Sequence, residues 1–198
     1  PYIMQETLKK LWANQELINK LLETKNTLKK SSENLYIADF DDTIFCRKEQ
    51  LEQSELLRTN RWAKWNQAIL DTMWIDVLAK DFYEWKTYPN CVTSLLRENH
   101  DLILTAGIQE IQNAKLKATQ LTHINTIVTL HAVDKIIALI SYVIFELKFL
   151  PKEITVFEDR PQFFIEYRSL IEELLETKLI IKHVTMNSNH EPINMTDV

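Results

Sequence analysis

The chain has 198 residues, of which 45% are hydrophobic and 26% are charged, as expected of one globular domain with an elaboration. Its single glycine excludes the glycine-rich phosphate-binding loops of nucleotide-binding folds, which need several glycines for close backbone approach. The formal net charge of −5 gives no sign of a protein that coats nucleic acid, although a local basic patch is compatible with it.

The cellular setting is predicted from the cysteines and the apolar runs. Cys46 and Cys91 form neither a metal-binding motif nor a disulfide framework, which favours a reducing compartment. No apolar run reaches the length of a membrane span, and the first thirty residues are too charged for a signal peptide. We therefore expect a cytoplasmic protein that does not contact a membrane.

Residues 3–30 contain no glycine or proline and carry the apolar spacing of a heptad pattern. The positions with this spacing are Met4, Leu8, Leu11, Gln15, Ile18 and Leu22. The pattern predicts one long amphipathic helix within an N-terminal segment of residues 1–34. Such a helix either packs on its own domain or pairs with another copy of the chain or with an upstream domain.

Residues 35–45 combine a short apolar segment with three aspartates. Residues 35–38 predict a buried strand, after which Asp39 and Asp41 follow two residues apart. Ligands of an open parallel sheet bind beyond the carboxyl ends of its strands. Two carboxylates this close repel each other unless a cation or a shared proton relieves them, so the pattern predicts a bound metal. The alternative is an acidic turn whose aspartates accept backbone hydrogen bonds.

Residues 46–87 are charged and helical in pattern, and they predict a small helical cap inserted after the first strand. Trp62, Trp65, Trp74 and Trp85 lie in this insert. These tryptophans either form a local core or line a lid on which a nucleobase could stack. A helix over residues 91–98 is expected to follow.

A second strand is predicted over residues 101–104, and it leads into Thr105, Ala106 and Gly107. Thr105 can either offer its hydroxyl and backbone N–H to a phosphate oxygen or cap the next helix. That helix is predicted over residues 109–121, and a β-branched segment at residues 124–130 predicts a third strand.

The last third of the chain adds two strands and two helices to the prediction. An apolar helix over residues 132–150 carries Lys135 near its start, where a lysine could simply be solvated. A fourth strand over residues 154–157 ends in Glu158, Asp159 and Arg160. A helix over residues 162–177 and a strand over residues 179–186 follow, and the polar residues 187–198 predict a frayed tail. Together these elements predict an α/β fold with a mainly parallel five-stranded sheet and flanking helices.

Four of these stretches, in this order, resemble the four motifs of the haloacid dehalogenase (HAD) superfamily. They are Asp39-Phe40-Asp41-Asp42-Thr43, the strand that ends in Thr105, the helix-borne Lys135, and Glu158-Asp159. The resemblance covers about residues 35–186 and implies a Rossmann-like domain with a cap. The tryptophan-rich insert and Phe157-Glu158-Asp159-Arg160, followed by Phe163-Phe164, are similar to the HAD domains of nucleic-acid repair proteins. Those include the Swiss Army knife RNA-repair type and the phosphatase half of polynucleotide kinase-phosphatases.

The resemblance implies a magnesium-dependent phosphomonoesterase. Asp39 would attack phosphorus to form an aspartyl-phosphate, and Asp41 would protonate the leaving oxygen and later activate water. Thr105 and Lys135 would hold the phosphate. The implied ligands of Mg²⁺ are Asp39, Asp41 through its backbone carbonyl, Glu158 and Asp159. The implied substrate contacts are Thr43, Ala106, Gly107 and Arg160.

Two positions depart from the pattern of many relatives. Asp42 stands where glycine is common, and Ala106-Gly107 replaces a Gly-Arg pair, so Arg160 would carry more of the phosphate contact. The implied substrate is a nucleic-acid end, 3′-phosphate rather than 5′, or a nucleotide. The alternatives are a small-metabolite phosphatase and a HAD-fold binding or assembly module with little catalysis.

Overall fold

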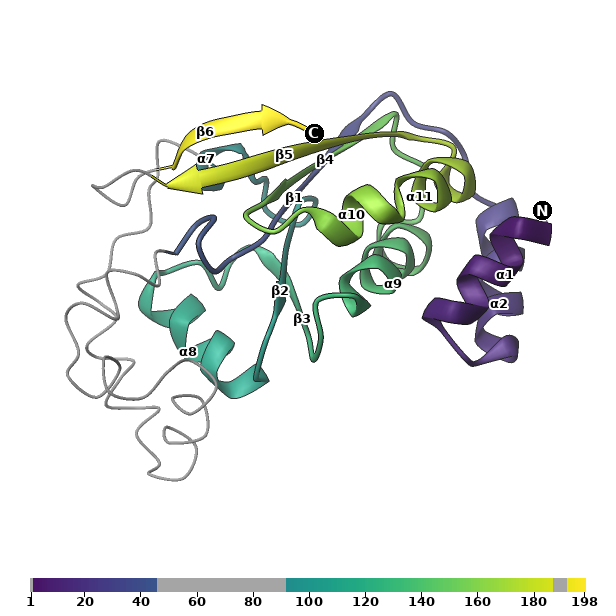
Figure 1. The fold of residues 1–198 in the computed structure, drawn as a ribbon, viewed down its shortest axis with the longest axis horizontal. Helices are drawn as coiled ribbons and strands as arrows, with labels where there is room; N and C mark the ends of the chain where they lie inside the picture. Colours follow the sequence, from purple (N-terminus) through teal and green to yellow (C-terminus); the bar gives the residue numbers. More distant parts are fainter. Residues whose placement is uncertain (1, 46–91, 187–191) are drawn as a thin grey trace.

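The structure is a computed structural model, and it describes residues 2–45, 92–186 and 192–198 (Figure 1). The cap predicted at residues 46–87, with its tryptophans, lies outside the described residues, as does the first residue of the helix predicted over residues 91–98. Within the described part, no helix is long and apolar enough to cross a membrane.

Six strands form one sheet in the order β3-β2-β1-β4-β5-β6. The strands are β1 (Asn34–Ala38), β2 (Leu102–Ala106), β3 (Asn125–Thr129), β4 (Glu153–Glu158), β5 (Lys178–Met186) and β6 (Pro192–Asp197). All neighbours are parallel except β5 and β6, which are antiparallel. The five strands predicted from the sequence are confirmed, with ends that differ by one or two residues.

The sixth strand corrects the prediction of a frayed tail. β6 pairs with β5 at the edge of the sheet, from Pro192 opposite Met186 to Asp197 opposite Lys182. Lys182 and Asp197 also form an ion pair, and the Val198 N–H donates to the Ile181 carbonyl at 3.0 Å. Backbone pairing of this kind needs no apolar side chains, so the polar composition of the segment did not indicate a strand.

The sheet separates two apolar cores because successive side chains of a strand point to opposite faces. On one face, Ile37, Leu104 and Val156 pack in the core beneath α9 (Asp134–Ser141), α11 (Arg168–Leu175), α1 (Tyr2–Leu11) and α2 (Gln15–Asn26). On the other face, Ala38, Ile103 and Phe157 pack in the core with α7 (Val92–Leu95) and α8 (Gln109–Ala118). Figure 1 shows α8 apart from the group formed by α9, α10 and α11.

The predicted N-terminal helix is broken into two. α1 ends at Leu11, and Asn14 begins α2 by accepting a hydrogen bond from the Leu17 N–H through its side-chain oxygen at 3.1 Å. Asparagine is among the most favoured residues at the start of a helix, so the helix is interrupted here although the apolar spacing continues. The two helices lie side by side (Figure 1). α1 packs against α9 and α11, and α2 packs against the π-helix Tyr142–Leu147 that follows α9.

Four further helices end earlier than predicted. α7 ends at Leu95 and α8 ends at Ala118, before the expected ends at residues 98 and 121. The helix expected over residues 132–150 consists of α9 and a π-helix, Tyr142–Leu147, which ends at Lys148 in the left-handed conformation. It stops there because Leu150 pairs with the backbone of Lys29 and Ser31. The helix expected over residues 162–177 is split at Tyr167 into α10 (Gln162–Glu166) and α11.

The strand order fixes where a ligand can bind. From β1 the chain proceeds outward to β2 and β3, and it then returns to form β4 on the other side of β1. The order therefore reverses between β1 and β4, and the crevice beyond the carboxyl ends of these two strands is the usual ligand site of such sheets. Asp39 directly follows β1, and Glu158 is the last residue of β4.

Candidate active site

Three acidic side chains meet at the reversal point between β1 and β4. Asp39, Glu158 and Asp159 line a cavity of about 220 Å³, together with Asp41 and Lys135. Asp39 and Glu158 are buried, with 6% and 3% of their surface exposed. Their backbones are held together because the Asp39 N–H donates to the Phe157 carbonyl at 2.9 Å, continuing the pairing of the two strands.

Lys135 lies between two of these carboxylates. It belongs to the first turn of α9, and its Nζ is 2.8 Å from Asp39 Oδ1 and 3.0 Å from Glu158 Oε2. The side chain is only 6% exposed, so the alternative of a solvated lysine is wrong. Charged groups this deeply buried need partners to offset their loss of hydration, and here each supplies a partner for another.

The pKa values of the cluster follow from burial and from these contacts. Burial alone would raise the pKa of Asp39, but the positive charge of Lys135 and hydrogen bonds with Asp159, Glu158 and Lys135 together outweigh it and hold that pKa below its ordinary value. Burial would likewise lower the pKa of Lys135, but Asp39 and Glu158 outweigh it and raise that pKa. Asp39 therefore stays ionised and Lys135 stays protonated at neutral pH.

Glu158 and Asp159 are the two carboxyl groups of the cluster whose pKa values are raised. Burial, and then the charge of Asp39, raise the pKa of Glu158 well above its ordinary value. Burial and a hydrogen bond to Asp39 raise the pKa of Asp159 to about 7. One lysine therefore does not fully compensate three acids, and the site favours either bound protons or a further cation.

The cluster fits a hard divalent cation such as Mg²⁺. Asp39, Glu158 and Asp159 each offer a carboxylate oxygen, and these oxygens lie within 4.8 Å of one another. Carboxylate oxygens are the ligands that Mg²⁺ prefers in proteins. These three residues could therefore hold the ion. A contact from the Asp41 backbone carbonyl stays a prediction.

The Asp41 carboxylate is turned toward α8 and away from this cluster. Lys115 Nζ lies 3.0 Å from Asp41 Oδ1, and Gln112 Nε2 donates to Asp41 Oδ2 at 2.9 Å. The Gln112 amide also donates to Thr105 Oγ1 at 2.7 Å. Asp41 still lines the cavity, with its side chain 16% exposed.

The two threonines of the predicted site are both fully buried. The Thr105 hydroxyl accepts a hydrogen bond from the Gln112 amide. Thr43 Oγ1 has no hydrogen-bond partner among the residues that the structure describes. Neither threonine is among the described residues that line the cavity. The substrate contact expected of Thr43 therefore stays a prediction.

The remaining predicted substrate contacts lie at different depths. Ala106 lines the cavity, but the Gly107 N–H donates to the Thr129 carbonyl at 2.8 Å and is thus used within the fold. Arg160 lines the cavity with its side chain 76% exposed, and its Nε is 3.9 Å from Asp159 Oδ2. Arg160 is therefore placed at the mouth, where it can reach an incoming anion.

The turn after β1 contains the residue that departs from the HAD pattern. Asp42, at a position where many HAD proteins have glycine, adopts a φ of 59°. Aspartate is among the few side chains that enter this left-handed region routinely. Asp42 is therefore compatible with the left-handed conformation of this turn.

Gln112 and Lys115 were missed in the sequence. Both are buried, at 2% and 3% exposed, although α8 reads as an ordinary polar helix. The signal that could have indicated Lys115 is its spacing, because it lies four residues after the buried Ile111, on the apolar face of the helix.

Comparison of the chain with protein-family models, with curated proteins and with solved structures finds no match.

Proposed function

We propose that the protein is a magnesium-dependent phosphomonoesterase that works through an aspartyl-phosphate on Asp39. The observation that carries the proposal is the buried cluster in which Lys135 bridges Asp39 and Glu158, with Asp159 beside them. A phosphate ester is anionic, and its transfer requires an in-line nucleophile and positive charge around its oxygens. The cluster offers a nucleophile, a cation and a metal-binding set within one cavity.

Asp39 has the properties that a carboxylate nucleophile requires. Its pKa is held below the ordinary value, so it is ionised, and it lines the cavity although it is largely buried. Its oxygen would form a bond to phosphorus while the bond to the leaving oxygen breaks. Asp41, which lines the same cavity, would give a proton to that leaving oxygen.

Hydrolysis of the aspartyl-phosphate would return the enzyme to its starting state. Asp41 would take a proton from water as the water oxygen attacks phosphorus, and the bond to Asp39 would break to release phosphate. Lys135 and the exposed Arg160 would offset charge on the phosphate oxygens. A magnesium ion held by Asp39, Glu158 and Asp159 would supply additional positive charge.

The substrate class that we propose is a nucleic-acid end or a nucleotide. Arg160 and Phe163 both line the cavity and are exposed, so the cavity offers an incoming substrate a cation and an aromatic ring. A base stacked on an aromatic ring gains about 1–3 kcal/mol. The net charge of −5 favours contact with one or two nucleotides over a long footprint. The preference for a 3′-phosphate rests on the HAD resemblance.

The first test is the variant Asp39→Asn, assayed with saturating magnesium. We expect turnover to fall by about three orders of magnitude or more, since the amide is not a nucleophile, while the unfolding midpoint shows that the variant folds. Glu110→Gln, an acid-to-amide change on the exposed face of α8, is the matched control and should keep wild-type activity. Near-wild-type turnover of Asp39→Asn would show that Asp39 is not the nucleophile.

The same assay, applied to a substrate panel, separates the proposed substrate class from its alternatives. The panel contains 3′-phosphorylated and 5′-phosphorylated oligonucleotides, mononucleotides and sugar phosphates. A preference for sugar phosphates would support a small-metabolite phosphatase and end the nucleic-acid proposal. Magnesium binding without turnover on any member would support a binding module.

A further inference from the structure

α8 carries a lysine and a glutamine whose side chains are buried, and buried side chains of these types need polar partners. Lys115 is 3% exposed and Gln112 is 2% exposed, and neither is among the described residues that line the cavity. Both donate to the carboxylate of Asp41, which does line the cavity. Neither side chain is therefore placed to contact a substrate, but both contact a residue that is.

Each oxygen of the Asp41 carboxylate receives one of these donors. Lys115 donates to Oδ1 at 3.0 Å and Gln112 donates to Oδ2 at 2.9 Å, so rotation of the carboxylate would break one contact or the other. A carboxylate oxygen can accept two hydrogen bonds, so each keeps capacity for exchange of a proton on the cavity side.

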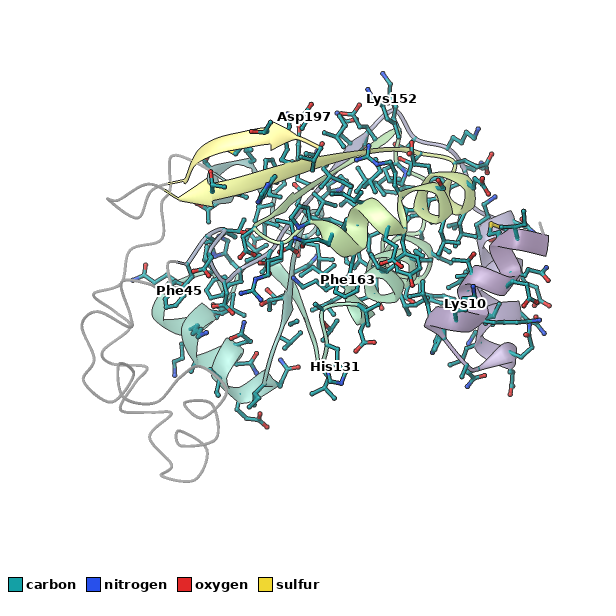
Figure 2. All side chains as sticks on the ribbon, viewed as in Figure 1. Lys10, Phe45, His131, Lys152, Phe163 and Asp197 are labelled. Carbon is teal, nitrogen blue, oxygen red and sulfur yellow. The ribbon has the colours of Figure 1, made fainter. Side chains whose placement is uncertain are left out.

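The two donors are themselves held in place. The Gln112 amide also donates to Thr105 Oγ1 at 2.7 Å, which ties Asp41 after β1 to the end of β2. Lys115 Nζ lies 5.4 Å from the centre of the Phe45 ring, and that ring stacks on Phe40. Figure 2 shows Phe45 beside α8. The carboxylate is thus fixed by side chains that have little freedom of their own.

We propose that Gln112 and Lys115 are positioning residues that fix the Asp41 carboxylate for proton exchange with the leaving group. This inference rests on the proposed phosphatase function, in which Asp41 gives a proton to the leaving oxygen. A misplacement of about 1 Å can cost a factor on the order of 100 in rate, and the rigid donors prevent it. α8 is accordingly part of the catalytic apparatus although none of its side chains touches the substrate.

The test uses the leaving group as a probe of the Asp41 proton. An alkyl phosphate needs protonation of its leaving oxygen, whereas 4-nitrophenyl phosphate releases a stable anion and needs little help. For Lys115→Met we expect kcat/KM to fall about 10- to 100-fold on the alkyl phosphate and less than about 3-fold on the aryl phosphate, with KM nearly unchanged. Lys117→Met, an exposed lysine on the same helix, is the control and should change neither.

A double-variant cycle separates positioning from a general loss of structure. In an Asp41→Asn background, Lys115→Met should have little further effect, because its effect passes through the Asp41 carboxylate. Gln112→Leu should show the same dependence on the leaving group, and it carries the test if the lysine variant fails to fold. Equal losses on both substrates, or a full additional loss in the Asp41→Asn background, would overturn the inference and leave the phosphatase proposal intact. No wild-type turnover on either substrate would overturn both.

Discussion

Gly107 is the one glycine of the chain, and both its backbone conformation and its surroundings favour glycine. Its φ is 154°, a conformation that residues with a Cβ rarely adopt. A Cβ at this position would also lie 3.3 Å from Cγ and from Cδ of Gln112, closer than most such contacts. The glycine therefore leaves room for the Gln112 side chain to reach Thr105 and Asp41.

We expect Gly107→Ala to lower the free energy of unfolding by about 1–3 kcal/mol through backbone strain and the crowding of Gln112. Urea unfolding measures the loss. In a Gln112→Ala background the loss should shrink but persist, because the crowding is relieved and the unfavourable φ is not. Unchanged stability of Gly107→Ala would mean that the backbone at this position differs from the one described.

Some individual residues of the candidate site could be predicted from the sequence, and others could not. Asp39 and Glu158 could be predicted because a carboxylate directly after an apolar strand is placed at the ligand edge of a parallel sheet. Lys135 gave no such signal by itself, since a lysine in the first turn of a helix is usually solvated. Gln112 gave no signal, and Lys115 gave only its spacing from the buried Ile111, because α8 is otherwise a polar helix that also carries the exposed Lys117.

Strands and helices differed in how well the sequence specified them. The parallel strands are short apolar runs bounded by polar residues, so their positions were predicted closely. The helices were predicted too long, because an apolar periodicity continues across breaks that local hydrogen bonds decide. Asn14 begins a new helix through its cap, and Leu150 leaves its helix to pair with Lys29 and Ser31.

The apolar stripe of α1 and α2 is buried within this chain. Leu8, Ile18 and Leu21 are at most 1% exposed and belong to the core under α9 and α11. Of the two alternatives for the N-terminal segment, packing on its own domain accounts for these three side chains. Leu17 faces outward with 36% of its surface exposed.

We expect Leu21→Ala to lower the free energy of unfolding by about 2–5 kcal/mol, because it removes a buried side chain and leaves a cavity. Leu17→Ala is the matched control on the same helix and should change stability by less than about 0.5 kcal/mol. Unfolding in denaturant measures both, and sedimentation records the mass. If Leu21→Ala dissociated an oligomer without loss of stability, the stripe would instead pack between subunits.

The charge balance of the cavity affects the stability of the whole molecule. Asp159 has its pKa raised from 3.8 to about 7, and Glu158 is raised in the same direction, so the folded protein binds more protons than the unfolded chain across this range. The stabilisation is therefore fully present below the ordinary pKa and is lost as the pH rises through the raised one. The opposite effect of Asp39, whose pKa is lowered, is confined to more acidic pH.

We expect the metal-free protein, kept in a chelator, to lose stability between about pH 4 and pH 7, by up to about 1.4 kcal/mol per pH unit for each proton lost. Magnesium should stabilise it more at the upper end of this range than at the lower, because the ion competes with protons for the same carboxylates. Thermal unfolding at several pH values, with chelator and with magnesium, measures both effects. Asp159→Asn should flatten the metal-free profile. A metal-free protein that gains stability across this range would contradict the assignment.

The position of β4 beside β1 also determines the stage of synthesis at which the cluster of Asp39, Lys135 and Glu158 can form. Lys135 and Asp39 are 96 positions apart, and Glu158 arrives only after Lys135 has been made. A nascent chain that has completed β3 and α9 therefore holds a lysine with one of its two acidic partners and no complete set of metal ligands. β4 must pair with β1, the first strand to be synthesised. Pairing between strands that are far apart in the sequence is slow to form. A ribosome-bound fragment that ends before β4 consequently lacks Glu158 and Asp159, so the cluster around Lys135 is complete only after β4 has paired with β1.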